Sequence, residues 1–172
     1  MVPIVERGQC IDNPKYVNTT VKIHSTSIEN RMDLEFAVTR LIENPLLVTL
    51  SFLKVSIRLW LNAASGALRA PLYNRTLDFC SFLRNPGQYK LAQIIYKEIK
   101  RNGNMPTGCP ISVTSYSFRG ISLSQMRLPS FFIETDFILD VAGYAGAEKE
   151  PVLDSHWFGS VKKVKCTRKE RC

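Results

Sequence analysis

The residues best suited to catalysis or metal binding are few, and their spacing does not group them. His24 lies in an alternating polar pattern, and His156 stands beside Trp157 with no Ser or Cys pattern nearby. No G-x-S-x-G motif marks an acyl-transfer nucleophile. Glu134 and Asp136 are two residues apart and could chelate a cation, but a solvated strand face is the more common setting for such a pair. We therefore expect no enzyme activity, no metal and no cofactor.

Cysteines and glycosylation motifs carry a different chemistry. The five cysteines are Cys10, Cys80, Cys109, Cys166 and Cys172. None belongs to a C-x-x-C pair and only two histidines are present, so the pattern favours two disulfides and one remaining thiol over a zinc site. N-glycosylation sequons begin at Asn18 and at Asn74. Disulfides and sequons together indicate an oxidising, extracellular compartment.

The N-terminus allows two interpretations. Its first ten residues, MVPIVERGQC, lack the apolar core of a signal peptide. The protein is then either cytosolic or a mature secreted form to which an initiator Met has been added. The cysteines and sequons favour the second, so we expect a secreted protein whose signal peptide has been removed. No window of about 18 apolar residues occurs, so no transmembrane segment is predicted.

Composition predicts a single globular domain over residues 1–172. Hydrophobic residues make up 45% and charged residues 22%, and a chain of this length can bury its own core. We place that core at about residues 10–165, followed by a basic tail at 166–172. The net charge of +8 is concentrated near this tail, which we interpret as a solvated end. No basic-aromatic stacking motif accompanies it, so a nucleic-acid partner is not expected.

Alternation of apolar and polar residues predicts a mainly β protein. The expected strands are 16–24, 33–42, 46–61, 72–80, 111–118, 131–141 and 155–165. The phase of the third strand slips at Phe52-Leu53, as at a β-bulge or at a bend between two strands. Asn18 and Asn74 both fall on polar strand faces, where a glycan has room. About seven strands of this kind favour a two-sheet antiparallel sandwich.

One segment instead has the spacing of an amphipathic helix. Between residues 86 and 101, apolar residues recur every three or four positions: Leu91, Ile94, Ile95 and Ile99. Asn85-Pro86 favours a helix start, and Asn102-Gly103 favours its end. We expect this helix to pack against an edge or mouth of the sandwich. Residues 142–147 are small and are predicted to link the last two strands.

The segment 71–83, PLYNRTLDFCSFL, resembles the signature of a large insect family of secreted proteins. The family has no assigned function and includes the chemosensory CheB-like proteins. Its pattern is Leu-Tyr-Asn, a spacer, an Asp, then Cys-x-Phe-Leu, followed by an amphipathic helix and a Cys-Pro pair, here Cys109-Pro110. An acidic, aromatic strand like 131–141 and a Trp-bearing strand like 155–165 come next. The resemblance extends over about residues 10–165.

This family is similar to the ML (lipid-recognition) superfamily, whose members are immunoglobulin-like sandwiches that hold lipid between two sheets. The resemblance implies a bridge between Cys80 and Cys109, which flank the helix. It also implies a bridge from Cys10 to Cys166, with Cys172 as the alternative partner. Family members usually carry another cysteine near the first strand, which this chain lacks, while Cys166 and Cys172 follow the last strand.

The function implied by the resemblance is to carry or present a small hydrophobic ligand, such as a lipid or a pheromone-like molecule, in chemosensation. Large apolar residues on the inner strand faces would line the cavity. The candidates are Leu50, Phe52, Val55, Ile57, Leu59, Phe118, Ile133, Phe137 and Leu139. The alternative is a secreted recognition module with a closed core, which binds a receptor or another extracellular protein through a sheet edge or the basic tail.

Overall fold

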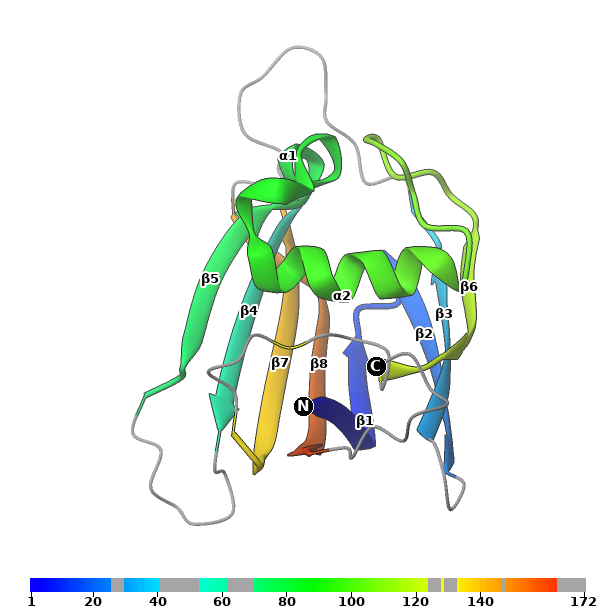
Figure 1. The fold of residues 1–172 in the computed structure, drawn as a ribbon. Coiled ribbons are helices and arrows are strands. Elements are labelled where there is room, and N and C mark those ends of the chain that lie inside the picture. The colour runs from blue at the N-terminus through cyan, green and yellow to red at the C-terminus, as the bar shows by residue number, and fades with distance from the viewer. Residues whose placement is uncertain are drawn as a thin grey trace.

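Two antiparallel sheets form the structure, a computed structural model that describes residues 1–25, 30–40, 53–61, 70–123, 128, 133–146 and 148–163 (Figure 1). One sheet has five strands in the order β1-β8-β7-β4-β5, and the other has three in the order β2-β3-β6. The strands are β1 (Val2–Asp12), β2 (Val17–Ser25), β3 (Asn30–Val38), β4 (Lys54–Leu61), β5 (Tyr73–Asp78), β6 (Ser115–Ile121), β7 (Thr135–Ala145) and β8 (Glu150–Lys162). The predicted mainly β sandwich is confirmed.

Alternation sorts the side chains of the five-stranded sheet between core and outer surface. On β7, Leu139 is paired with Leu59 of β4 and Trp157 of β8, and this row faces the second sheet. The next residue, Asp140, is paired with Arg58 and His156, and that row faces outward. Because side chains on a strand alternate between faces, one register gives the sheet an apolar inner face and a charged outer face.

The three-stranded sheet follows the same rule. Leu34 of β3 is paired with Val21 and with Phe118, and Leu34 and Phe118 are among the most deeply buried residues of the core. The adjacent Asp33 faces outward, where its carboxylate accepts the Gly120 N–H at 2.7 Å and contacts His24. These interactions favour the charged form and lower the pKa of Asp33.

Strand β1 is an element that the sequence analysis did not predict. It pairs along β8, and the register shifts between Val5 and Arg7. This irregularity places Val5 inside and both Glu6 and Arg7 outside, which interrupts the period of two. Strand β7 also runs further than expected, through Ala145, so residues 142–145 belong to a strand and not to the predicted link.

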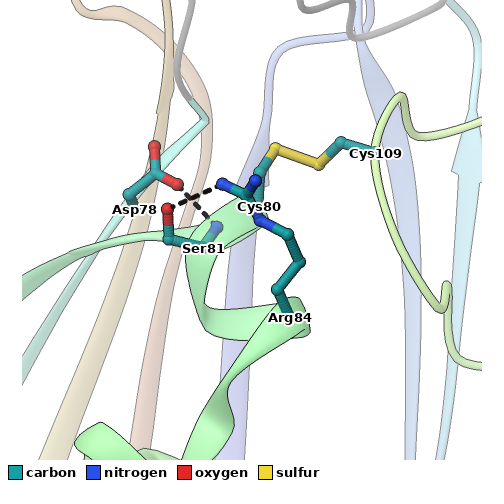
Figure 2. Close-up of a disulfide and its surroundings, with 5 residues drawn as sticks. All are labelled: Asp78, Cys80, Ser81, Arg84 and Cys109. Atoms are coloured by element: carbon teal, nitrogen blue, oxygen red, sulfur yellow. Dashed lines mark hydrogen bonds between the residues drawn. A yellow bond between two sulfur atoms is a disulfide. The ribbon is translucent and has the colours of Figure 1, made fainter.

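The helical region begins earlier in the chain and contains more elements than predicted. Helix α1 (Phe79–Arg84) follows β5 directly, then a 3-10 turn (Pro86–Gln88) precedes α2 (Lys90–Arg101). Asp78 ends the strand because its carboxylate caps α1, accepting the Ser81 N–H at 2.6 Å (Figure 2). The expected strand 72–80 therefore starts one residue too early and ends two residues too late, and the expected helix 86–101 starts four residues too early.

Helix α2 crosses the open side of the sandwich, between the edge strands β5 and β6 (Figure 1). Its C-terminal end is fixed to β6, because Arg119 N–H donates to Asn102 O at 2.9 Å and Ser117 N–H to Asn104 Oδ1 at 2.6 Å. At the other end, the predicted Cys80–Cys109 disulfide is confirmed and ties α1 to the segment that leads to β6 (Figure 2). No helix in the described part of the chain is long and apolar enough to cross a membrane.

Candidate functional site

An apolar cavity of about 240 Å³ lies between the two sheets and beneath α2. The five-stranded sheet contributes Pro3, Val5, Cys10, Val55, Ile57, Leu59, Leu61, Leu77, Phe137, Leu139, Val141, Leu153, Ser155, Trp157 and Val161, and the three-stranded sheet contributes Met32, Leu34 and Phe36. Phe79 and Phe82 of α1 and Leu91, Ala92, Ile94, Ile95, Tyr96 and Ile99 of α2 close it, with Met105, Leu123 and Leu128 from connecting segments. The cavity exceeds the roughly 150 Å³ at which apolar cavities already stay dry and bind benzene-sized molecules.

The lining carries very little polarity. Among the described lining residues there is no charged side chain and no side-chain amide. Ser155 is the one aliphatic hydroxyl, and it is engaged: Oγ donates to Val141 O at 3.0 Å and accepts the Trp157 Nε1–H at 3.1 Å. Because this hydroxyl has already used its proton, it has no donor left for a ligand.

The thiol of Cys10 belongs to the same wall, and its pKa depends on the polarity of that wall. Its side chain lies on the inner face of β1, next to Ser155 of β8. Burial disfavours the thiolate, and together with the nearby charge of Asp12 it raises the pKa of the Cys10 thiol to about 11. The thiol is therefore neutral at physiological pH, consistent with a low-dielectric surrounding.

Helix α2 contributes a broad apolar face to the cavity. Leu91, Ile95 and Ile99 lie one above the other at four-residue spacing, and all three are half-buried because they border open space as well as side chains. Lys97 on the opposite side is exposed. The sequence pattern identified this stripe, but only the topology reveals that it faces a cavity and not a filled core.

Five of the nine proposed cavity residues line the cavity in the structure: Val55, Ile57, Leu59, Phe137 and Leu139. Phe118 is 1% exposed but does not border the cavity; it packs in the core, in an edge-to-face contact with Phe36. Leu50 and Phe52 lie outside the described residues. Ile133 was wrongly assigned, since it precedes β7 and is 66% exposed. Ile133 has the same parity as the inward-facing residues of β7, but β7 begins only at Thr135.

The expected bridge from Cys10 to Cys166 is not present, because Cys10 carries a free thiol. Cys10 is paired with Ser155, whereas Lys163 follows the far end of β8. Cys166 and the alternative partner Cys172 lie outside the described residues.

The polar groups weighed for catalysis lie on the outer faces of the sheets. His156 Nδ1 is 2.7 Å from Asp140 Oδ1, and Arg58 is 3.5 Å from the other oxygen of Asp140. The neighbouring hydroxyl of Ser155 points to the opposite face, into the core, so it cannot serve His156 as a nucleophile. Glu134 accepts the Lys163 N–H at 2.6 Å. The described residues contain no cluster of three His, Cys, Asp or Glu side chains that could hold a metal.

Both sequon asparagines are exposed on edge strands. Asn18 lies on β2 at the edge of the three-stranded sheet, and Asn74 lies on β5 at the edge of the five-stranded sheet. Thr20 and Thr76, the third residues of the two motifs, are exposed beside them. Neither asparagine belongs to the cavity lining, so a glycan at either position would project away from the cavity.

Comparison with known proteins adds a family match over the centre of the chain. Residues 55–139 match the family described as "Protein of unknown function (DUF1091)". The match runs from β4 through the disulfide and α2 into β7, and so includes the cavity residues Val55, Ile57, Leu59, Phe137 and Leu139. No curated protein matches the chain. The description assigns no activity, so any function must be argued from the geometry.

Proposed function

We propose that the protein is a secreted carrier that binds a small hydrophobic ligand between its two sheets. The observation that carries this proposal is the cavity, which is walled by both sheets and α2. Apolar cavities between close-packed sheets are uncommon because interiors normally fill to crystal-like density. Here α2 stands between the sheet edges and leaves room for an alkyl chain.

The hydrophobic effect alone is sufficient to hold such a ligand. Each buried CH₂ contributes about 0.8 kcal/mol, so a chain of about sixteen carbons gains about 13 kcal/mol. Association costs about 4 kcal/mol or more in lost translational and rotational freedom. Because this cost is a minimum, the remainder is at most about 8–9 kcal/mol, which corresponds to a Kd no lower than somewhat below the micromolar range. No hydrogen bond from the cavity wall is needed to reach this affinity.

The extracellular setting belongs to the same proposal. The Cys80–Cys109 disulfide is of the kind that persists in oxidising compartments, and two exposed sequons are placed where glycans fit. The resemblance to CheB-like proteins suggests a role in chemosensation, in which the carrier presents a lipid or pheromone-like molecule to a receptor.

Native and denaturing mass spectrometry of protein secreted from insect cells tests the carrier function. Extra mass that is present under native conditions, is lost on denaturation and is identified as lipid would support it. The matched variants are Ile95→Trp, which fills the cavity from α2, and Gln93→Trp, which adds the same side chain to the other side of the helix. We expect Ile95→Trp to lose the bound lipid and Gln93→Trp to keep it. Lipid-free wild-type protein that also fails to bind added alkyl compounds would contradict the proposal.

Recognition of another extracellular protein is the second candidate. One observation favours it: a row of half-buried apolar side chains crosses the outer face of the five-stranded sheet through Trp60, Ile138 and Phe158. Arg7 continues this row and lies over the Phe158 ring at 4.3 Å. Aromatic residues and Arg are enriched in the binding hot spots of protein interfaces. A protein partner that binds wild type but not Trp60→Ala would support this function.

A further inference from the structure

The chemistry of the cavity wall restricts which hydrophobic molecules it can hold. Resting on the proposed carrier function, we propose that the ligand is neutral over its whole buried length, as in an alkyl ester or hydrocarbon, and that ionised fatty acids are excluded. The described wall contains no Lys, Arg or His to pair with a carboxylate, although the chain carries a net charge of +8. Within the part of the chain that the structure describes, the Lys, Arg and His side chains do not belong to the wall.

The basic residues of α2 and of the five-stranded sheet illustrate this separation. Lys97 is exposed on the side of α2 away from the cavity, and Lys100 is exposed with its Nζ 5.7 Å from the centre of the Tyr96 ring, outside the lining itself. Arg58, on the outer face of β4, lies near Asp140 and the Trp60 ring. Arg7 lies outside, over the Phe158 ring. Alternation within each strand keeps these cations on the face opposite the cavity.

Two uncharged polar groups of the wall, at Ser155 and Trp157, are already engaged and cannot replace a cation. The Ser155 hydroxyl donates its proton to Val141 O, and the Trp157 indole N–H is bonded to Ser155. Burial of Cys10 in this wall, together with the nearby charge of Asp12, raises the pKa of its thiol, in keeping with a wall that disfavours a negative charge. A buried carboxylate would therefore lack a cationic partner among the described wall residues, and burying an unpaired charge is so costly that the group takes up a proton instead.

This requirement has a measurable signature. If only the protonated acid enters, its apparent Kd rises about tenfold for each pH unit above the pKa of the acid, which is about 4–5 for an ordinary carboxyl group. An ester of the same chain length has no such group, so its Kd stays flat with pH. A Kd of the acid that rises with pH thus indicates a buried carboxyl group. A Kd that stays constant with pH indicates a carboxylate that remains in water, where its charge is tolerated.

The experiment is displacement of the neutral fluorescent probe N-phenyl-1-naphthylamine by dodecanoic acid, methyl dodecanoate and dodecan-1-ol at pH 5.5, 6.5 and 7.5. We expect the ester and the alcohol to displace the probe with no pH dependence. The acid should need about tenfold more at each step up in pH. Displacement by the acid that is flat with pH and within threefold of the ester would overturn the inference but leave the carrier function standing. If neither the probe nor any of the three compounds binds, the carrier function itself fails.

A charge introduced into the wall provides a second, independent test. Ile95→Lys places an ammonium group on the cavity face of α2, and Gln93→Lys places the same charge on the other side of the helix. We expect Ile95→Lys to improve binding of dodecanoic acid relative to its ester by at least tenfold at pH 7.5. Gln93→Lys should leave that ratio unchanged. An unchanged ratio in a folded Ile95→Lys variant would contradict the inference, and if that variant does not fold, the pH slope of the wild type still decides.

Discussion

Removing the Cys80–Cys109 bridge should destabilise the fold through the unfolded chain. Replacing both cysteines by serine opens a loop with a sequence separation of 29. On the chain-entropy model, closing such a loop contributes about 3.6 kcal/mol to the free energy of unfolding at 25 °C. For a chain of this length, each kcal/mol shifts Tm by about 2–4 °C. We therefore expect Tm to fall by roughly 7–14 °C.

Urea unfolding followed by tryptophan fluorescence measures this loss, since Trp157 is buried in the core. The matched control is Cys10→Ala, which removes a thiol that is not bonded and should change the free energy of unfolding by about 1 kcal/mol or less. A double variant that loses less than about 1 kcal/mol, with the wild-type bridge verified by mass, would refute the loop-closure argument.

Amide hydrogen exchange then identifies the state on which the bridge acts. If the effect is entropic, exchange in α2 accelerates only in proportion to the global loss of stability, because the bridge constrains the unfolded chain. If α2 instead exchanges far faster than the strands, the bridge holds the native helix in place. That second pattern would contradict the proposed mechanism even if the total loss matched.

Three further predictions follow from single sites. Gly8→Ala should destabilise the protein by about 1–3 kcal/mol in urea unfolding, because a Cβ at Gly8 would lie 2.5 Å from Trp157 Cζ3, whereas Gly143→Ala, with its nearest neighbours at 3.9 Å, should not. Asn18→Gln and Asn74→Gln should each remove the mass of one glycan from protein secreted by insect cells, and an unchanged mass would refute glycosylation at that site. Cys10 should react slowly with iodoacetamide at pH 8 in the folded protein and quickly in urea, because its pKa in the folded protein is raised to about 11. The same shift means that the contribution of Cys10 to stability is complete below about pH 8.5 and is lost as the pH rises towards 11.

The sequence was sufficient to predict which side chains lie on the inner faces of the strands, but not that these faces enclose a cavity. Val55, Ile57 and Leu59 could be assigned to an inner face because alternation is a local property of one strand. Whether two such faces meet in a filled core or around a cavity depends on how far apart the sheets stand. The helix α2 lies between the two sheet edges, and its anchors on β6 are contacts that join separate elements of the chain.

The errors have local causes of a recognisable kind. Asp78 was interpreted as a polar strand residue although Asp is also a favoured helix cap, and its capping of Ser81 ends β5 early. Ile133 shares a parity with Phe137, but alternation does not mark where a strand begins, and β7 starts only at Thr135. Strand β1 was missed because its bulge breaks the period of two.

The position of α2 between two sheet edges has a consequence for the range of ligands. A barrel closed entirely by strands has a circumference fixed by its strand number and stagger, because every neighbour is joined by backbone hydrogen bonds. Here the helix α2 lies between the two sheet edges. Along most of its length, α2 contacts the cavity only through its side chains. We expect the cavity to widen when α2 tilts, without loss of any hydrogen bond between neighbouring strands. For the proposed carrier, we therefore expect one set of strands to accommodate ligand chains of different thickness.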